Sequence, residues 1–320
     1  MKRKISIIVG GSGQFGICLS KILLKKGHKV ILTSRDVRRA KKKINYENKG
    51  LKILKLNVLK ISKIISLVKK NNPFQIFYFA GQSSPSLSFK KKVETYNSNY
   101  IGCMNFLNTI HNEKLNCKFI NASSSEIFAE TKKKINVNSK KKPISPYGKS
   151  KLLSFNKTKE FRIKKNIKAY NAIIFNTESV YRDRSYLIPK VCIAAIRAFK
   201  KNKKTNFGNI NVSREWNWCD EQVKYLIKFI DKKPQDFILS NGKSYTVKMM
   251  LKYAFKYFNL NYKNFIIPDK NLFRKKDFNV KKSNYLACAK RNKIDRKSKI
   301  YGKKIIYSII RYYLNENKYQ

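Results

Sequence analysis

ISIIVGGSGQFG, residues 5–16, is the stretch of sequence that decides the fold of this chain. Ile5 to Val9 form a mostly apolar run, which is typical of a strand buried on both faces of a sheet. Gly10, Gly13 and Gly16 then follow the pattern G-x-x-G-x-x-G. Such glycines between a strand and a helix let backbone N–H groups approach a pyrophosphate at the positive end of the helix. An ordinary glycine turn is the alternative, but the strand–turn–helix context favours dinucleotide binding.

Strands and helices alternate beyond this turn. We expect strands at residues 29–33, 51–56, 76–79, 118–121 and 169–175, and helices at residues 100–110 and 147–164. The alternation predicts an α/β fold with a Rossmann-like, doubly wound parallel sheet. Beyond about residue 176 it loosens, with helices expected at 188–199, 220–230 and 247–258, a short strand at 236–239, and a polar, weakly ordered stretch at 290–303. We therefore expect an NAD(P)-binding domain over residues 1–175 and a smaller, mainly C-terminal substrate-binding lobe over residues 176–320, interleaved with the first.

The end of the second strand discriminates between the two nicotinamide cofactors. An acidic residue there accepts hydrogen bonds from a ribose hydroxyl, whereas an arginine pairs with a 2′-phosphate. Arg35 stands at this place, with Arg38 and Arg39 behind it. The arginines favour NADP, and Asp36 leaves NAD as the alternative.

Tyr147 and Lys151 fit the pattern Y-x-x-x-K, which places both side chains on one face of a helix. A lysine ammonium at this spacing is expected to lower the pKa of the tyrosine phenol and to hold the nicotinamide ribose. The tyrosine can then take a proton from a hydroxyl as a hydride leaves. Tyr and Lys are abundant in this chain, so the pattern gains its weight from its position after the fifth expected strand.

Ser124 and Glu126 lie at the end of that fifth strand, where the sites of parallel sheets form. The Ser124 hydroxyl can hydrogen-bond the same substrate oxygen as Tyr147. The Glu126 carboxylate can remove a carbon-bound proton next to a newly formed ketone. The alternative is a helix N-cap serine with a glutamate in the first helical turn.

These motifs together resemble the GDP-mannose 4,6-dehydratases, which are extended short-chain dehydrogenases/reductases of the NAD-dependent epimerase/dehydratase family. The resemblance runs from about Lys4 to Asn284. Short segments of this chain carry the resemblance. With the family's own pattern in parentheses, they are residues 10–16 (G-I-T-G-Q-D-G), 79–83 (L-G-A-Q-S), 123–126 (S-T-S-E), 175–179 (F-N-H-E-S), 208–210 (G-N-L), 214–216 (R-D-W) and 273–274 (F-R).

The resemblance implies a lyase that converts GDP-mannose to GDP-4-keto-6-deoxymannose by transient oxidation at C4, loss of water across C5–C6 and return of the hydride to C6. It assigns the catalytic roles to Ser124, Glu126, Tyr147 and Lys151. The implied cofactor contacts are Gly10, Gly13, Gln14, Phe15, Gly16, Arg35, Asn57, Val58, Ala80, Gln82, Tyr147, Lys151, Thr177 and Arg182. The implied substrate contacts are Ser83, Asn176, Glu178, Lys190, Arg214 and Arg274. A homodimer or homotetramer is implied as well.

The sequence departs from the family pattern at several of these positions. Thr177 stands where the family has a histidine, and Asn57 where it has an aspartate. Asp36 replaces a second arginine, and Ser124 replaces a threonine but keeps the hydroxyl. Further departures lie at residues 217–218, where the family has glycine-histidine, and at residues 275–277, where it has P-A-E, so the divergence is heaviest in the substrate-binding lobe. The sequence therefore predicts the class of chemistry more sharply than the substrate.

The composition argues against several other classes of binding site and location. The formal net charge is +55, but the lysines are spread along the chain, which favours solvated faces over a specific nucleic-acid interface. Six cysteines without a C-x-x-C pair and two histidines predict neither a zinc site nor a disulfide framework. With no signal peptide expected and no apolar run of about 18 residues, we expect a cytoplasmic protein without membrane insertion.

Two alternatives stay open beside the dehydratase. A related nucleotide-sugar reductase or epimerase needs only the serine, Tyr147 and Lys151, so Glu126 discriminates it from a dehydratase. A basic nucleic-acid- or surface-binding protein that kept a nucleotide-binding fold is the other, and the joint presence of Ser124, Tyr147 and Lys151 argues against it.

Overall fold

The computed structural model describes residues 3–44, 46–273, 282–295 and 297–316. Its centre is a parallel sheet of seven strands in the order β11-β6-β5-β4-β1-β2-β3. The strands are β1 (Ile5–Val9), β2 (Lys29–Ser34), β3 (Leu51–Lys55), β4 (Gln75–Tyr78), β5 (Lys118–Ser124), β6 (Ala169–Ile174) and β11 (Asp236–Leu239). This confirms the expected doubly wound α/β fold. The chain order reverses between β1 and β4, and ligands of such sheets bind where that reversal leaves a crevice.

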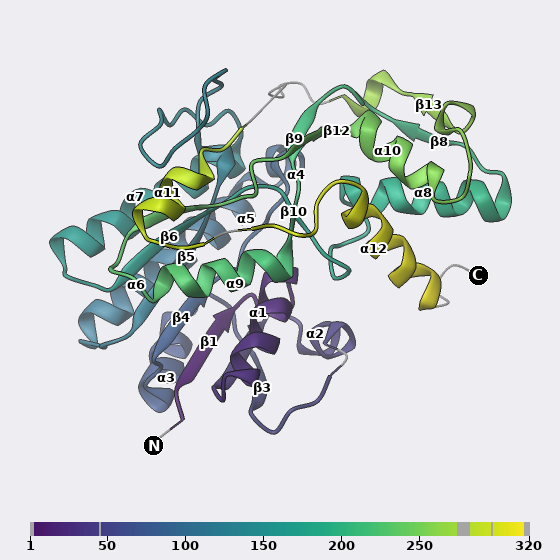
Figure 1. The fold of residues 1–320 in the computed structure, drawn as a ribbon. Helices are drawn as coiled ribbons and strands as arrows, with labels where there is room; N and C mark the ends of the chain where they lie inside the picture. The colour runs from purple at the N-terminus through teal and green to yellow at the C-terminus, as the bar shows by residue number, and fades with distance from the viewer. Residues whose placement is uncertain (1–2, 45, 274–281, 296, 317–320) are drawn as a thin grey trace.

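Helices cover both faces of the sheet. On one face α1 (Gln14–Lys25), α2 (Val37–Lys43) and α9 (Cys219–Ile230) bury their apolar sides, and Figure 1 shows α1 and α9 in front of the strands. On the other face lie α3 (Ile61–Asn71), α6 (Gly102–Asn112) and α7 (Pro146–Lys164). Two short helices, α4 (Pro85–Lys90) and α5 (Lys92–Tyr96), and a π-helical turn, η1 (Asn97–Ile101), lead from β4 into α6. Because both faces are covered, the inner strands β1 and β4 are almost wholly buried, whereas the edge strand β3 keeps its lysines exposed.

A smaller lobe lies at the right of Figure 1, beside the carboxyl ends of the strands. Three helices build its core: α8 (Leu187–Lys201), α10 (Val247–Lys256) and α12 (Lys303–Asn315). Its short strands pair as β13 (Ile266–Pro268) with β8 (Thr205–Phe207), β12 (Ser244–Thr246) with β9 (Ser213–Glu215), and β10 (Asn217–Trp218) with β7 (Thr177–Glu178). Helix α11 (Tyr285–Arg291) packs near β11. The division of the chain at residue 175 stays a prediction.

Two elements differ from the sequence-based expectation. β5 continues past Asn121 to Ser124, because Ala122, Ser123 and Ser124 pair with β6. Helix α12 was not expected at all, and it buries Ile305, Ile306, Ile309 and Ile310. The stretch 290–303 was expected to be weakly ordered, yet it leads from α11 to α12 and its Ile294 is buried.

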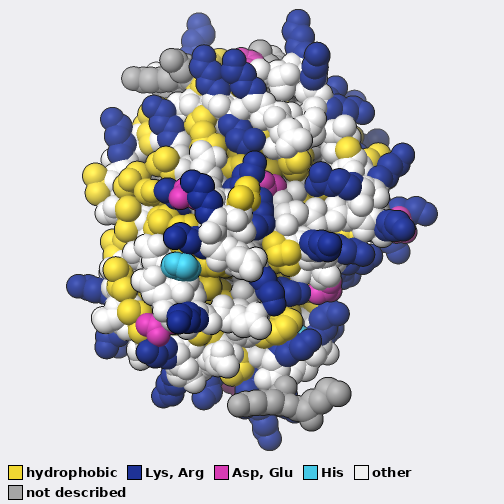
Figure 2. Space-filling view, turned by 90° about the vertical axis from the view of Figure 1, so that its left-hand side faces the viewer, with side chains coloured by type: hydrophobic (Ala, Val, Ile, Leu, Met, Phe, Trp, Pro, Cys, Tyr) yellow, Lys and Arg dark blue, Asp and Glu magenta, His cyan; other side chains and the backbone are white. Residues whose placement is uncertain are grey.

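The positive charge is distributed rather than gathered. Figure 2 shows Lys and Arg side chains scattered over the whole of the face in view, with acidic side chains between them. Such a surface repels itself at low ionic strength. In the described part of the chain, no helix combines the length and the apolar character needed to cross a membrane.

Candidate active site

The glycine turn lies between β1 and α1 and leaves no room for a Cβ at Gly10 or Gly16. Gly10 has a φ of +79°, and a Cβ built on it would lie 2.6 Å from the backbone nitrogen of Ala80. A Cβ on Gly16 would lie 2.4 Å from the Gly11 carbonyl oxygen. Within the described residues no side chain caps the N-terminus of α1, where Gly13 is the N-cap. The first N–H groups of a 12-residue helix are therefore free for an anion, and the turn fits a pyrophosphate.

Gln14 joins this turn to the segment after β6. Its amide nitrogen donates to the Thr177 carbonyl at 2.7 Å, and its amide oxygen accepts from the Ser179 hydroxyl at 2.8 Å. The sequence predicts Gln14 as a cofactor contact. The side chain lines the cavity, but its hydrogen bonds to Thr177 and Ser179 give it a further role, which is to fix the far wall relative to the glycine turn.

Ser124 is the last residue of β5, and Glu126 lies in the turn that follows it. The Ser124 hydroxyl accepts from the Glu126 N–H at 3.2 Å and so caps a short 3-10 turn, η2 (Ser125–Ile127). Helix α7 starts beside it, with Ser145 accepting from the Gly148 N–H at 3.0 Å and Pro146 in the first turn. A Cβ on Gly148 would lie 2.6 Å from the Glu126 carbonyl oxygen. This close approach of helix and turn holds Tyr147 over the end of β5.

Lys151 lies one turn after Tyr147 on α7, as the spacing predicts. Its Nζ donates to the Ala122 carbonyl at 2.8 Å, and it lies 6.0 Å from the centre of the Tyr147 ring. Burial lowers the pKa of Lys151 to about 8. Both side chains line the cavity.

The expected lowering of the Tyr147 pKa by Lys151 is wrong for this structure. Burial raises the pKa of Tyr147 to about 12, and this outweighs the hydrogen bond with Ser124 and the charge of Arg182, which both lower it. The physical reason is that the spacing puts the two residues on one face but does not point the ammonium at the phenol. Lys151 instead reaches the backbone of β5.

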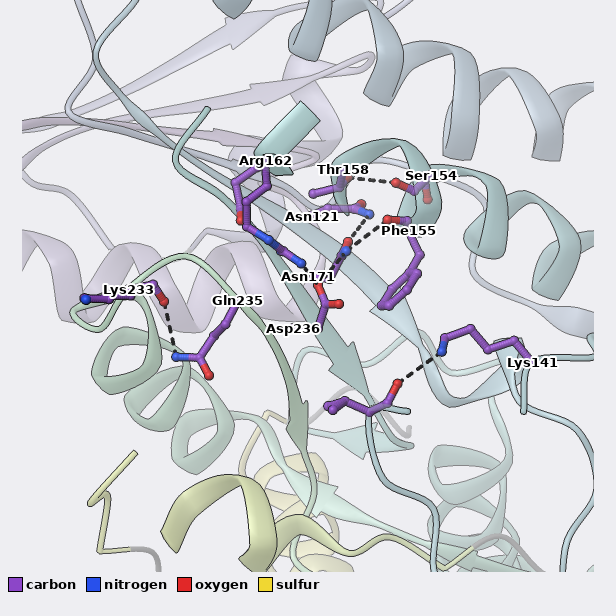
Figure 3. Close-up of polar contacts among 12 residues, drawn as sticks. Asn121, Lys141, Ser154, Phe155, Thr158, Arg162, Asn171, Lys233, Gln235 and Asp236 are labelled. Carbon is purple, nitrogen blue, oxygen red and sulfur yellow. Dashed lines mark hydrogen bonds and ion pairs between the residues drawn. The ribbon is translucent and has the colours of Figure 1, made fainter. Parts of the chain in front are cut away.

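A buried polar network holds the middle of α7 on the sheet (Figure 3). The Asn171 amide nitrogen donates to the Phe155 carbonyl at 3.0 Å and to Asp236 at 2.9 Å, and its oxygen accepts from Asn121 at 3.0 Å. Arg162 forms an ion pair of 2.9 Å with Asp236. The network thus joins β5, β6 and β11 to the same helix that carries Tyr147 and Lys151.

These elements surround one cavity of about 530 Å³. Most of the predicted site residues line it: Gly10, Gly13, Gln14, Phe15, Gly16, Gln82, Ser83, Ser124, Glu126, Tyr147, Lys151, Asn176, Thr177, Glu178, Arg182, Lys190 and Arg214. Arg35, Asn57, Val58 and Ala80 do not line it, although Ala80 touches Gly10. Arg274 lies outside the described residues.

The end of β2 lies beyond the cavity. The Asp36 carboxylate accepts from the Arg39 N–H at 2.9 Å and caps α2. Arg35 is exposed and pairs with Glu94 at 3.3 Å. Since the Asp36 carboxylate is engaged by a helix end, Arg35 is the better placed of the two to meet a ligand.

The substrate-side wall comes from the smaller lobe. Lys190 of α8 donates to the Asn206 carbonyl at 2.7 Å and lies 4.6 Å from the centre of the Phe207 ring. Arg214 of β9 is buried and donates to the Ser213 carbonyl at 2.7 Å. Two cationic side chains and an aromatic ring around the same space suit a nucleoside diphosphate.

Glu178 and Arg182 line the cavity between the glycine turn and the residues of the smaller lobe. The Glu178 Oε2 lies 3.8 Å from the Arg182 Nε. Burial raises the pKa of Glu178 to about 7, although the charge of Arg182 acts against it. Sequence reasoning missed Tyr186, which lines the cavity over Arg182, because it belongs to none of the motifs. Its only sequence signal is its position, four residues after Arg182 and directly before a helix.

The fold is shared with enzymes of nucleotide-sugar chemistry. A solved dTDP-glucose 4,6-dehydratase from Bacillus anthracis in complex with NAD superposes with a TM-score of 0.83 at 14% identity, covering 99% of this chain and 98% of that one. A UDP-glucose 4-epimerase from Thermotoga maritima with UDP-glucose gives 0.84 at 18% identity, covering 98% and 99%. At these identities the likeness shows the fold.

The sequence is similar to curated dehydratases over most of its length. GDP-mannose 4,6 dehydratase 1 of Arabidopsis thaliana is 28% identical over 288 residues, which are 85% of this chain and 80% of that protein. The human GDP-mannose 4,6 dehydratase is 26% identical over 270 residues, 79% of this chain and 72% of that protein. The model of a family described as GDP-mannose 4,6 dehydratase matches residues 7–297, and the chain therefore belongs to that family.

Proposed function

We propose that this protein is a hydro-lyase that converts GDP-mannose to GDP-4-keto-6-deoxymannose with NADP as its cofactor. The observation that carries the proposal is the meeting of Ser124, Glu126, Tyr147 and Lys151 on the wall of the cavity that the glycine turn also lines. A reductase or epimerase needs a hydroxyl, a tyrosine and a lysine, whereas only the elimination of water calls for the additional carboxylate.

The residues fit a nicotinamide dinucleotide. The open N-terminus of α1 suits its pyrophosphate, and the Lys151 ammonium suits the hydroxyls of its nicotinamide ribose. The choice of NADP is supported by Arg35, since its guanidinium is exposed while Asp36 is engaged as the cap of α2. Held by the glycine turn and Lys151, the cofactor would supply reversible hydride transfer for C4 and C6 of the sugar.

The chain's own residues supply the proton transfers. Burial keeps the Tyr147 phenol protonated in this structure, and a positively charged nicotinamide ring bound beside it would lower its pKa, so that Tyr147 could then take the proton of the 4-hydroxyl. Ser124, which is hydrogen-bonded to Tyr147, donates to the same oxygen. The resulting ketone acidifies the proton on C5, and Glu126 removes it. Glu126 then gives this proton to the hydroxyl group on C6, which leaves as water, and the proton held by Tyr147 goes to C5 as C6 receives the hydride. Lys190 and Arg214 hold the diphosphate, and a guanidinium fork matches its oxygens well.

The decisive experiment is to incubate the purified protein with NADP⁺ and a panel of GDP-, UDP- and dTDP-sugars and to follow product mass. Loss of one water from GDP-mannose without added NADPH supports the proposal. Glu126→Gln is expected to stop this loss, whereas Glu130→Gln, an exposed change of the same kind a few residues away, should leave it unchanged. A product of unchanged mass would instead indicate an epimerase, and NADPH-dependent reduction a reductase.

We also propose that the protein forms a homodimer or homotetramer and works in the cytoplasm. Phe89 of α4 and Val93 of α5 are exposed apolar side chains close to α7, which supports self-association. The six cysteines are buried and free, which suits a reducing compartment. Light scattering at defined concentrations tests the assembly, and fluorescence microscopy of the tagged protein tests the location.

A further inference from the structure

Two loops that are far apart in the sequence meet across the cavity. The Tyr186 hydroxyl and the Ser83 hydroxyl form a hydrogen bond of 2.7 Å. Ser83 follows β4 at the carboxyl edge of the sheet, and Tyr186 is the N-cap of α8 in the smaller lobe. Both residues line the cavity. The pair therefore connects the cofactor side of the site to the substrate side.

The side chain of Arg182 packs against the Tyr186 ring. The Arg182 guanidinium carbon lies 3.6 Å from the ring centre, a cation–π stack. Arg182 is itself placed by the buried carboxylate of Glu178, 3.8 Å from its Nε. A ring held in this way presents its hydroxyl in one place, and a ligand meets a group that needs no further ordering.

The two hydroxyls keep unused hydrogen-bonding capacity. A hydroxyl offers one donor and two acceptor positions, so a mutual bond leaves the pair with one donor and several acceptors. Neighbouring hydroxyls on a sugar ring offer donors and acceptors in the same mixture. The pair also faces the same cavity as the reacting group, since Tyr147 lines it as well.

We propose that Tyr186, with Ser83, binds the sugar-ring 3-hydroxyl, which is next to the carbon that Tyr147 acts on, or the 2-hydroxyl beside it, and that Tyr186 is a specificity-determining residue. The inference rests on the proposed function, because it takes the ligand to be a nucleotide sugar. Glu178 and Arg182 act here as positioning residues that hold the Tyr186 ring.

The test compares Tyr186→Phe with Tyr181→Phe. Both variants lose only a hydroxyl, but Tyr181 does not line the cavity and its hydroxyl bonds Lys21. Affinities are measured by calorimetry for GDP-mannose, for its 2-deoxy and 3-deoxy analogues, and for GDP, in the presence of NADP⁺. We expect Tyr186→Phe to lower the affinity for GDP-mannose about tenfold and to leave the affinity for GDP unchanged. The variant should also bind one of the two deoxy analogues as tightly as GDP-mannose. Tyr181→Phe should match the wild type.

An equal loss for GDP and GDP-mannose, or no loss at all, would overturn the inference, because Tyr186 would then only join the two loops. Since binding does not depend on turnover, the result is separate from that of the proposed reaction. If the wild-type protein binds GDP-mannose without eliminating water, the proposed reaction fails and Tyr186 is still judged on affinity. If no sugar raises affinity above that of its nucleoside diphosphate, the sugar subsite fails too.

Discussion

The Lys151 ammonium is bonded to the Ala122 carbonyl at 2.8 Å, and its pKa is lowered by burial to about 8. Lys151 is therefore charged below that pH and loses its proton above it. A neutral amine holds ribose hydroxyls less well than an ammonium. We expect the affinity for NADP⁺ to fall as the pH rises from about 7 to about 9.5, by roughly tenfold in total.

Fluorescence titration of NADP⁺ across that range checks this prediction. Lys151→Met should bind weakly at every pH and show a nearly flat profile. Lys149→Met, an exposed neighbour on α7, serves as the control. A wild-type profile that stays flat would mean that Lys151 does not contact the cofactor.

Arg35 is expected to decide between the two cofactors. Its ion pair with Glu94 is exposed, so a 2′-phosphate can compete for the guanidinium at little cost. Arg35→Ala should lower the affinity for NADP⁺ by about tenfold to a hundredfold and leave the affinity for NAD⁺ nearly unchanged. Calorimetric titration of both cofactors tests this, with the exposed Lys41→Ala as the control. Parallel losses for the two cofactors would refute a role for Arg35 in discrimination.

Asn171 should matter for stability through the network of Figure 3. It is fully buried, and Asn171→Ala leaves the Phe155 carbonyl, Asn121 and Asp236 without this partner. We expect a loss of about 2–4 kcal/mol in the free energy of unfolding. Urea denaturation measures it, and Asn138→Ala on an exposed loop should cost about 0.5 kcal/mol or less. A small loss at Asn171 would show that water replaces the missing amide.

Much of the site could be predicted because each catalytic side chain stands at a fixed place relative to a strand or helix. Ser124 ends β5, Tyr147 opens α7, and the glycine turn follows β1. Such positions follow from periodicity and from the rule that parallel strands gather their carboxyl ends at one edge. Local pattern and topology together were sufficient here.

Other features depend on contacts that local sequence does not contain. Tyr186 becomes part of the site only because it meets Ser83, 103 positions earlier in the chain. The pKa of Tyr147 depends on how deeply the phenol is buried and on where Lys151 points, neither of which the spacing determines. Helix α12 has apolar residues on one face, but its N-cap is Gly302, and no side chain among the described residues caps its first turn.

The net charge of +55 should make stability depend on salt. Repulsion among scattered lysines and arginines, visible over the face in Figure 2, destabilises the compact state, and salt screens it. We expect the melting temperature to rise by several degrees, about 5 °C, between about 0.02 M and 0.5 M NaCl. Differential scanning calorimetry tests this. A melting temperature that falls with salt would show that the attractive ion pairs dominate instead.

Glu178 makes the stability of the fold depend on pH between about 4.5 and 7. Its pKa in the folded protein is raised by burial to about 7, from an ordinary value of 4.5. The folded state therefore binds more protons than the unfolded state between these two values, and stability falls as the pH rises through them. Above about pH 7 the buried carboxylate costs up to about 3 kcal/mol.

Glu178→Gln removes this titration. The variant should lose less stability than the wild type between about pH 5 and pH 8, and it should be the more stable protein at pH 8. Urea denaturation at each pH measures the difference, with the exposed Glu130→Gln as the matched control. If the variant and the wild type lose stability in parallel, the Glu178 carboxylate is already charged at pH 5, because its attraction to Arg182 outweighs the cost of its burial.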